Sequence, residues 1–481
     1  MSGYTIEDLV NILPIVFVVV WALALLMVEA FTKRRGLTLV LAAVGLLAAL
    51  FLTVSQFGVE TTAFKNMLTV DGYSLFMYVL VLGSGLFSIA LAYDYNKRMG
   101  WERGEYYVLM LFSIAGAMLM ASAANLIVVF LALELLSIPL YILAAFVPND
   151  AASEEAGLKY FLLGAFAGGF VLYGVALIYG ATGATDLMAI VSAASTTESP
   201  LLLLIGAALI LIGLGFKVAV VPFHMWTPDV YQGAPTPVTA YMAVVAKAGG
   251  FAALLRVFIA AFPSVSQDLV PVLSALVILT LVIGNLAALA QKNIKRMFAY
   301  SSISHAGFIM MAFVTYGQAD LYADAVTSVL FYLLAFAVTS FGSWAVVVAL
   351  EQAEGKGLNL EDYAGLGKKH PALALSMLVF LLSFAGVPPT LGFGGKFFLF
   401  RTVLEGGYVG LAIVGVLASL VSAYYYLRVV IYMYFHDGDP EVRSEPVLNF
   451  VTAVTAVGTL FLFFMSGPIL KWAAESILAL I

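Results

Sequence analysis

The chain has 481 residues, of which 63% are apolar and only 10% are charged, and its formal net charge is −6. Soluble domains carry roughly a quarter charged and under half apolar residues, so this composition excludes an ordinary cytosolic enzyme and a disordered chain. It also excludes a nucleic-acid partner, which would require a basic face. We therefore predict a polytopic membrane protein.

Uncharged stretches of about 20 residues, the length that crosses a bilayer, recur along the whole chain. We predict fourteen membrane-spanning helices, at 12–31, 37–57, 73–93, 106–121, 125–147, 156–180, 200–222, 236–260, 269–290, 298–317, 322–350, 371–404, 408–435 and 447–471. The stretches 322–350 and 371–404 exceed a straight span, so they must tilt, break or extend past the bilayer. The first stretch is preceded by acids rather than basic residues and lacks a cleavage motif, so it is expected to be a retained helix. Residues 1–481 then form a single membrane domain.

Basic residues alternate between the two faces of this arrangement. Thirteen lie in loops on one face, and Arg428 lies near the same face: Lys33, Arg34, Arg35, Lys97, Arg98, Arg103, Lys292, Lys295, Arg296, Lys356, Lys368, Lys369 and Arg443. The other face has Lys65, Lys471, and Arg256 and Arg401 at helix ends. The positive-inside rule makes the first face cytoplasmic and puts both termini outside.

Six ionisable side chains remain inside predicted spans: Glu134, Lys159, Lys217, Lys247, His305 and Lys396. A charge at the bilayer centre costs at least about 2.5–3.5 kcal/mol, so such residues usually mark ion pathways. The alternative is that they form structural ion pairs or reach the interface, which suits Lys159 best because it lies near a helix start. Glu134 is the only acid placed deep in a span, and one acid cannot neutralise four ammonium groups. We therefore predict a chain of lysines and histidine that passes protons.

Two of these lysines lie where the helix is expected to break. Lys217 follows Gly213 and Gly215 and precedes Pro222, whereas Lys396 follows the Gly/Pro cluster that begins at Gly386. Proline removes a backbone donor and clashes with the preceding turn, although Pro222 alone is also compatible with a packing kink. Broken helices at matching places indicate inverted repeats around an ion path. We predict repeats at 106–260 and 269–435, flanked by helices at 12–93 and 447–471.

His305 lies among serines rather than alone. Ser301, Ser304, His305 and Phe308 have the spacing that places side chains on one helical face. A lone buried histidine is often a satisfied core residue. Three serines on the same two turns instead favour a hydrated polar face.

The sequence lacks the residues that usually bind redox cofactors. It has no cysteine, which excludes disulfides and thiolate-held zinc, haem or iron–sulfur clusters. Its four histidines are too scattered to indicate a metal site: His224, His305, His370 and His436. Any redox cofactor involved in the function is expected to lie elsewhere.

Several motifs together resemble a known family. Val221–Val238 reads Val-Pro-Phe-His-Met-Trp-Thr-Pro-Asp-Val-Tyr-Gln-Gly-Ala-Pro-Thr-Pro-Val and is followed by Lys247. This resembles the signature of the antiporter-like membrane subunits of complex I, the proton-pumping NADH:quinone oxidoreductase. Further matching segments are Glu134–Pro139, Gln291–Arg296, Tyr300–His305 and Gly386–Lys396, so the resemblance covers about residues 70–435.

Three details bring the pattern nearest the N branch of that family, whose mitochondrial counterpart is subunit 2. They are the loop 230–237, a lysine rather than a glutamate at position 396, and the lack of a long lateral helix after the last span. One departure is Pro388-Pro389, where the family more often has a single proline. The resemblance implies an all-α, antiporter-like fold of fourteen helices, with two inverted five-helix repeats and discontinuous helices.

The resemblance also implies roles on a polar axis. Glu134 and Lys217 would form a pair whose separation tunes the affinity of the lysine for a proton. Lys247 would be the central relay, and Lys396 would face the exit or the neighbouring subunit.

Lys159 and His305 would be intermediate members of the same axis. His224, in the loop after Pro222, would lie near the cytoplasmic entrance. The alternative for His224 is a loop residue that caps the broken helix.

The function implied is proton translocation inside complex I, with this chain as a non-redox subunit of the enzyme. NADH, FMN, iron–sulfur clusters and quinone would bind to partner subunits, and none of them to this chain. The partners would be the lipid bilayer and other membrane subunits of the complex, including further antiporter-like ones. The location would be the bacterial inner membrane, with periplasmic termini. Alternatives are a subunit of a multi-subunit cation/proton antiporter and, with less support, a quinone-binding redox subunit.

Overall fold

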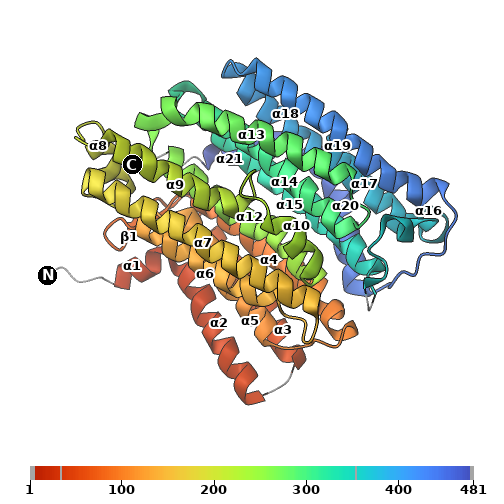
Figure 1. Cartoon of the computed structure of the whole chain (residues 1–481). Helices are drawn as coiled ribbons and strands as arrows, with labels where there is room; N and C mark the ends of the chain where they lie inside the picture. The colour runs from red at the N-terminus through yellow and green to blue at the C-terminus, as the bar shows by residue number, and fades with distance from the viewer. Residues whose placement is uncertain (1–5, 33–34, 260, 353–354, 477–481) are drawn as a thin grey trace.

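The protein is a bundle of long helices that lie side by side (Figure 1). A computed structural model describes residues 6–32, 35–259, 261–352 and 355–476. Within those residues, thirteen helical segments are long and apolar enough to cross a membrane. Eleven contain one long α-helix each: α2 (Leu13–Thr32), α3 (Arg35–Ser55), α4 (Gly72–Arg98), α5 (Glu105–Ser122), α6 (Leu126–Ala144), α7 (Ala151–Thr182), α9 (Pro200–Val218), α13 (Ser266–Leu289), α15 (Tyr322–Leu350), α19 (Val409–Phe435) and α20 (Pro446–Phe464).

The other two of the thirteen combine different helix types. The span that contains Lys247 runs through α11 (Thr236–Tyr241), the π-helix η1 (Met242–Ala246), α12 (Lys247–Leu254) and a second π-helix, η2 (Leu255–Ile259). The next innermost span is α14 (Ile294–Met311), which continues as the 3₁₀-helix η4 (Ala312–Thr315). π-helical turns are rare and frequently occur at functional sites, so the two π-helices on either side of α12 mark the segment of Lys247 as a candidate functional site.

The fourteenth predicted helix, at 371–404, is split. It consists of α17 (Pro371–Ala385) and α18 (Leu391–Glu405), and the Gly/Pro cluster lies between them. The predicted break after Lys217 is also confirmed, because α9 ends at Val218 and the short α10 (Trp226–Gly233) follows after a loop. The predicted span 200–222 thus ends four residues earlier, at Val218. In contrast, α15 is an unbroken helix of 29 residues.

Short elements fill the connections. They are α1 (Ile6–Asn11), the antiparallel strands β1 (Thr61–Ala63) and β2 (Leu68–Val70), α8 (Leu187–Ala194), η3 (Pro263–Val265), η5 (Ala319–Leu321), η7 (Leu360–Tyr363), α16 (Leu366–Lys369) and α21 (Ser466–Glu475). The predicted helix 447–471 is divided between α20 and α21 because the chain turns at Met465.

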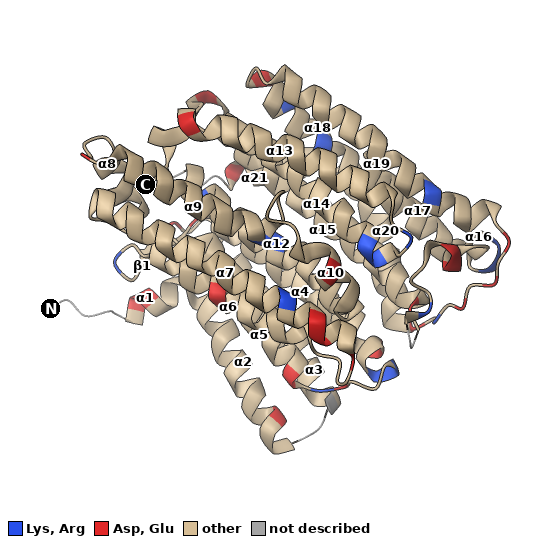
Figure 2. Cartoon of the chain, viewed as in Figure 1, with Lys and Arg blue, Asp and Glu red and all other residues tan. Residues whose placement is uncertain are grey.

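Burial varies strongly among the spans. The segments Thr236–Ile259 and Ile294–Thr315 are almost completely enclosed, whereas α2 and α20 leave most of their surface outside the protein. Charged residues gather at the ends of the helices and in loops, most densely around α10 and α16, while the helix shafts are mainly uncharged (Figure 2). This is the pattern of a multi-pass membrane protein. Lys247 lies on one of the two most enclosed segments among the described residues.

Candidate proton-transfer axis

Lys217 lies in the last turn of α9, where three elements meet. Its ammonium group is buried and donates to Ser137 Oγ on α6 at 2.8 Å and to Tyr160 Oη on α7 at 3.0 Å. The ring of Tyr160 stacks on the indole of Trp226 on α10, with ring centroids 4.5 Å apart. Trp226 in turn donates to the Phe216 carbonyl at 2.9 Å. The broken end of the helix is thus closed by aromatic packing around the lysine.

Glu134 lies on α6, one turn before Ser137, and is partly exposed. Its carboxylate passes close to α7, because a Cβ at Gly168 would lie 2.8 Å from Glu134 Oε1. Glu134 interacts electrostatically with Lys217, but the hydrogen bonds of Lys217 go to hydroxyl groups. The structure therefore brings the predicted pair into one neighbourhood without a direct contact, and the role of the pair stays a prediction.

Lys247 is the first residue of α12, directly after the π-helix. Its Nζ donates to the Ser302 carbonyl at 2.5 Å and to Ser302 Oγ at 2.6 Å, both on α14. The ring of Phe336 on α15 lies 6.0 Å from Nζ. The lysine is held by one serine and by aromatic packing, and among the described residues no carboxylate acts on it.

His305 lies between two buried tyrosines. Its Nδ1 is 2.7 Å from Tyr332 Oη on α15, and its Nε2 is 3.1 Å from Tyr426 Oη on α19. Tyr426 also hydrogen-bonds to Ser301. A neutral imidazole has one donor and one acceptor, so one tyrosine donates to the ring while the other accepts from it. The hydrogen bonds that join Ser301, Tyr426, His305 and Tyr332 can therefore be donated in either direction along the series, depending on the tautomer of His305.

Lys396 lies in the second turn of α18. It donates to Ser419 Oγ on α19 at 2.6 Å and to the Ala385 carbonyl at the end of α17 at 3.1 Å. Its Nζ lies 4.5 Å from the centre of the Phe308 ring, within the range of a cation–π contact. The Ala385 carbonyl is free to accept because α17 stops there. The helix break thus supplies a ligand to the lysine.

Lys159 does not join the buried lysines. Its Nζ pairs with Asp229 Oδ2 and with Glu155 Oε1, each at 2.7 Å, and its side chain is 41% exposed. Arg296 binds the other oxygen of Asp229 at 2.7 Å. Burial raises the pKa of Asp229, but the hydrogen bonds from Lys159 and Arg296 outweigh it and hold that pKa below its usual value. The geometry supports the ion-pair alternative for Lys159.

His224 lies in the loop between α9 and α10 and is partly buried. Burial lowers its pKa, and the backbone of Pro222 opposes the shift. Its Nδ1 has no hydrogen-bond partner among the described residues. The structure shows no hydrogen bond from His224 to the lysines of the axis in the part of the chain that it describes.

Two buried ion pairs at helix ends, whose acids lie outside the predicted spans, were not predicted from the sequence. Asp71 is 1% exposed and binds Arg256 through both oxygens, at 2.8 and 2.9 Å. Glu351 is 6% exposed and lies 3.9 Å from the Nζ of buried Lys295. All four residues lie at helix ends, where loops and neighbouring helices cover them. Hydropathy alone assigns such positions to the surface.

Sequence reasoning also missed the tyrosines that bind the axis residues. Tyr160, Tyr332 and Tyr426 look like ordinary aromatic residues of apolar helices, and no local signal separates them from the other tyrosines. Within the described residues, no group of three or more His, Asp or Glu side chains is placed to hold a metal ion.

Comparison with known proteins identifies the family of this chain. Residues 123–422 match the family model described as NADH:quinone oxidoreductase/Mrp antiporter, transmembrane. The NADH-quinone oxidoreductase subunit N of Trichlorobacter lovleyi is 44% identical, over 97% of this chain and 96% of the relative. The chain belongs to the family of NADH-quinone oxidoreductase N subunits. The predicted resemblance is thereby confirmed.

Solved structures confirm the antiporter-like fold. A chain of respiratory complex I from Thermus thermophilus with bound aureothin is 37% identical, with a TM-score of 0.82, over 96% of this chain and 99% of that chain. A chain of the Mrp complex from Dietzia is only 22% identical, with a TM-score of 0.87, over 98% and 97% of the two chains. The second likeness shows a shared fold alone.

Proposed function

We propose that the chain translocates protons as a membrane subunit of an NADH-quinone oxidoreductase, along an axis through Glu134, Lys217, Lys247, His305 and Lys396. The observation that carries the proposal is a shared contact: each of the three buried lysines donates to a serine hydroxyl of a neighbouring helix. The names of the relatives indicate the enzyme complex, and the three lysines are the groups that would bind and release the protons.

Hydroxyl partners suit a lysine that changes its protonation state. An ammonium group donates to a hydroxyl oxygen, and a neutral amine accepts from the same hydroxyl after the proton rotates. A carboxylate at contact distance would instead favour the charged form. Lys217, Lys247 and Lys396 can therefore keep their contacts with Ser137, Ser302 and Ser419 in either state, which is what a relay requires.

The repeats at 106–260 and 269–435 are proposed on the same basis. Each contains five spans, and in each the fourth span is the broken one, α9/α10 in the first and α17/α18 in the second. An odd number of spans inverts the second repeat relative to the first, so the two breaks face the membrane from opposite sides. The axis then runs from one repeat into the other through Lys247.

We place Lys159 in the Asp229 cluster at the cytoplasmic end, outside the axis, and His224 near the cytoplasmic entrance. The positive-inside rule places both termini in the periplasm of a bacterial inner membrane. Electron transfer from NADH through FMN and iron–sulfur clusters to quinone is assigned to partner subunits, which include further antiporter-like chains. This chain itself would do no redox chemistry.

The test is proton pumping by the purified complex in sealed proteoliposomes. Lys247→Ala should leave assembly intact and lower pumping by about 100-fold, the low end for loss of a proton-transferring group. Lys356→Ala, at an exposed loop position, is the matched control and should pump normally. Wild-type pumping by Lys247→Ala would contradict the proposed axis. Purification of the chain with partners that do not oxidise NADH would favour the antiporter alternative.

A further inference from the structure

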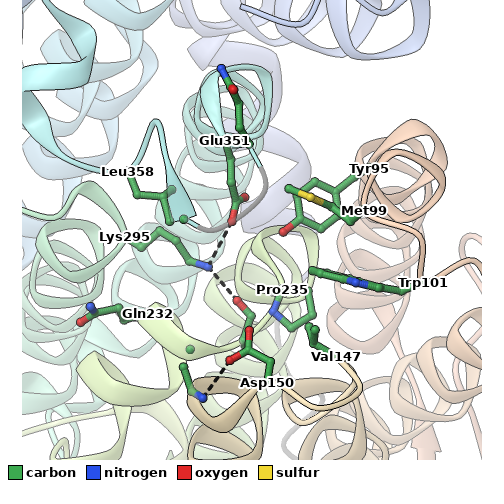
Figure 3. Close-up of a pocket in the computed structure, with 15 residues that line it drawn as sticks. Tyr95, Met99, Trp101, Val147, Asp150, Gln232, Pro235, Lys295, Glu351 and Leu358 are labelled. Carbon is green, nitrogen blue, oxygen red and sulfur yellow. Dashed lines mark hydrogen bonds and ion pairs between the residues drawn. The ribbon is translucent and has the colours of Figure 1, made fainter. Parts of the chain in front are cut away.

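A cavity of about 550 Å³ lies beside Lys295 and Glu351 (Figure 3). It is bounded by α4, the loop between α6 and α7, α10, α14 and the end of α15. Polar and apolar side chains both line it, among them Tyr95, Val147, Asp150, Gln232, Lys295 and Glu351. The cavity lies apart from the hydroxyl partners of the proposed axis, and nothing described so far uses it.

Glu351 is the unusual group in this cavity. Its Oε1 is 3.9 Å from Lys295 Nζ, a long ion pair, and Lys295 donates instead to the Ala234 carbonyl at 2.7 Å. Glu351 Oε2 is buried and makes no hydrogen bond of ordinary geometry among the described residues, and the nearby hydroxyl group of Tyr95 acts on this carboxylate. A buried carboxylate oxygen without a partner is costly, so it requires water or a proton. The cavity has room for water, since each molecule occupies about 30 Å³ in the liquid.

Other titratable groups face Glu351 from each side. Lys295 on α14, Tyr95 on α4 and Tyr363 in η7 all interact electrostatically with its carboxylate. Arg98 on α4 donates to its backbone carbonyl at 3.4 Å, and Asp150 acts on Lys295 from the opposite wall. A proton that binds to Glu351 is therefore taken up close to Lys295 and Arg98.

The inner wall of the cavity leads to Lys247. Thr236 begins the helix of Lys247, and its backbone N–H donates to Tyr95 Oη at 3.4 Å. Lys247 lies eleven positions after Thr236 in this helix, a rise of about 16 Å. Lys295 and Ser302 both lie on α14, about 10 Å apart along the helix axis. The two helices that hold the Lys247–Ser302 contact thus both start at the cavity.

We propose that this cavity is a water-filled vestibule in which Glu351 takes up protons and passes them toward Lys247. The inference rests on the proposed function of the axis. The carboxylate binds a proton from vestibule water and releases it inward through water beside Tyr95 and Thr236. Glu351 then returns to its charged form, and neutral Lys247 becomes an ammonium group. Thr236 Oγ1 is buried near the Tyr95 hydroxyl and makes no hydrogen bond of ordinary geometry among the described residues, so it can bind such a water.

Hydration of the vestibule can be tested without touching the ion pair. Because the chain has no cysteine, a single introduced cysteine is its only thiol. Val147 lines the cavity, whereas Val346 is buried in α15 and does not line it. In inside-out vesicles that contain the whole complex, a charged, impermeant thiol reagent should label Val147→Cys several-fold faster than Val346→Cys. Equal, slow labelling of both would overturn the vestibule.

The role of Glu351 is tested by Glu351→Gln, with Glu361→Gln as an exposed control in η7. Pumping by Glu351→Gln should fall about tenfold, less than the ~100-fold typical of a proton-transferring group because vestibule water can bypass it. Glu351→Asp should restore part of the rate, and Glu361→Gln should pump normally. Wild-type pumping by assembled Glu351→Gln would overturn the proposal.

Failure of the vestibule and failure of the axis give different results. If Lys247→Ala pumps normally while Val147→Cys is still labelled, the proposed axis is wrong and the vestibule stands. If Val147→Cys is not labelled while Lys247→Ala still loses pumping, the vestibule is wrong and the proposed axis stands.

Discussion

Lys217 and Lys396 lie on opposite sides of the breaks in their helices. Lys217 is one residue before the end of α9, whereas α18 begins five residues before Lys396. Yet each ammonium group lies at the carboxyl end of a half-helix, Lys217 in α9 itself and Lys396 against the Ala385 carbonyl that ends α17. The carboxyl end of a helix carries partial negative charge, which stabilises a cation. The two breaks therefore provide the same electrostatic site by different routes.

The surroundings of the two lysines differ in one respect. Both donate to a serine, Ser137 or Ser419. Lys217 also has Glu134 in its electrostatic neighbourhood, whereas among the described residues no carboxylate acts on Lys396. The first break thus has a counter-charge within the chain, and the second depends on dipoles and on the Phe308 ring. Changes that remove or exchange these features test whether the difference matters.

The largest effect is expected from the lysine that has no counter-charge. Lys396→Ala should lower pumping by about 100-fold, because it removes a titratable group from the proposed axis. Lys396→Glu should keep part of the activity, since a protonated carboxyl can donate to Ala385 and Ser419 and still relay protons. The measurement is protons pumped per NADH oxidised, with assembly checked on native gels. Equal activity of the Ala and Glu variants would show that titration at position 396 has no part in the mechanism.

Glu134→Gln makes the first break resemble the second. It keeps the size of the side chain and removes the charge that acts on Lys217. We expect a loss of pumping of about tenfold, smaller than the ~100-fold expected for loss of a relay group, because the serine and tyrosine contacts of Lys217 remain. Glu155→Gln, on an exposed face of α7, is the control. If Glu134→Gln pumps like the wild type at every pH, the counter-charge is irrelevant.

The sequence predicted the parts of this comparison that depend on hydropathy and on glycine and proline. The spans, the two breaks and the depth of Lys217, Lys247 and Lys396 follow from uncharged stretches and from the cost of buried charge. Partners across helices do not follow, because hydropathy does not report which faces meet. Tyr160 and Tyr426 are therefore invisible until the helices are packed.

Helix ends were the second weakness of sequence reasoning. Glu351 and Lys295 border predicted spans, where a charged residue normally faces water, yet loops and neighbouring helices cover both. Lys159 shows the opposite error. It lies within an apolar stretch, but its position near the start of α7 lets it reach Asp229 at the surface. The single sequence contains no signal of tertiary cover, so depth in the bilayer cannot be read from distance along a helix alone.

Exchanging the residues that end the two half-helices should give a smaller effect. Gly386 has φ 84° and Ala219 has φ 65°, both left-handed. Gly386→Ala would add about 1–2 kcal/mol of backbone strain. Its Cβ would also lie 2.8 Å from Lys396 Cδ and displace the lysine. Ala219→Gly should instead relieve strain of about the same size. Thermal dissociation of the purified complex measures both, and a Gly386→Ala variant as stable and active as Ala219→Gly would contradict this account.

The smallest effect is expected at Asp229, outside the buried axis. Lys159 and Arg296 hold the pKa of Asp229 below its ordinary value of 3.8, against the opposing effect of burial. A depressed carboxyl pKa contributes stability above its ordinary value, and the contribution is lost as the pH falls through the depressed one. Asp229→Asn should therefore lower the dissociation temperature of the complex slightly at about pH 7, and the difference should disappear as the pH falls through the depressed pKa of Asp229.

Because all three side chains are partly exposed, salt should weaken the effect of Asp229→Asn. Asp320→Asn, at an exposed position, serves as the control and should change neither stability nor pumping. Pumping by Asp229→Asn should stay near that of the wild type, since its ion pairs do not reach Lys217. A pumping loss as large as that of Lys247→Ala would mean that Lys159 belongs to the proton path. The buried hydroxyl contacts would then no longer distinguish the residues of the axis.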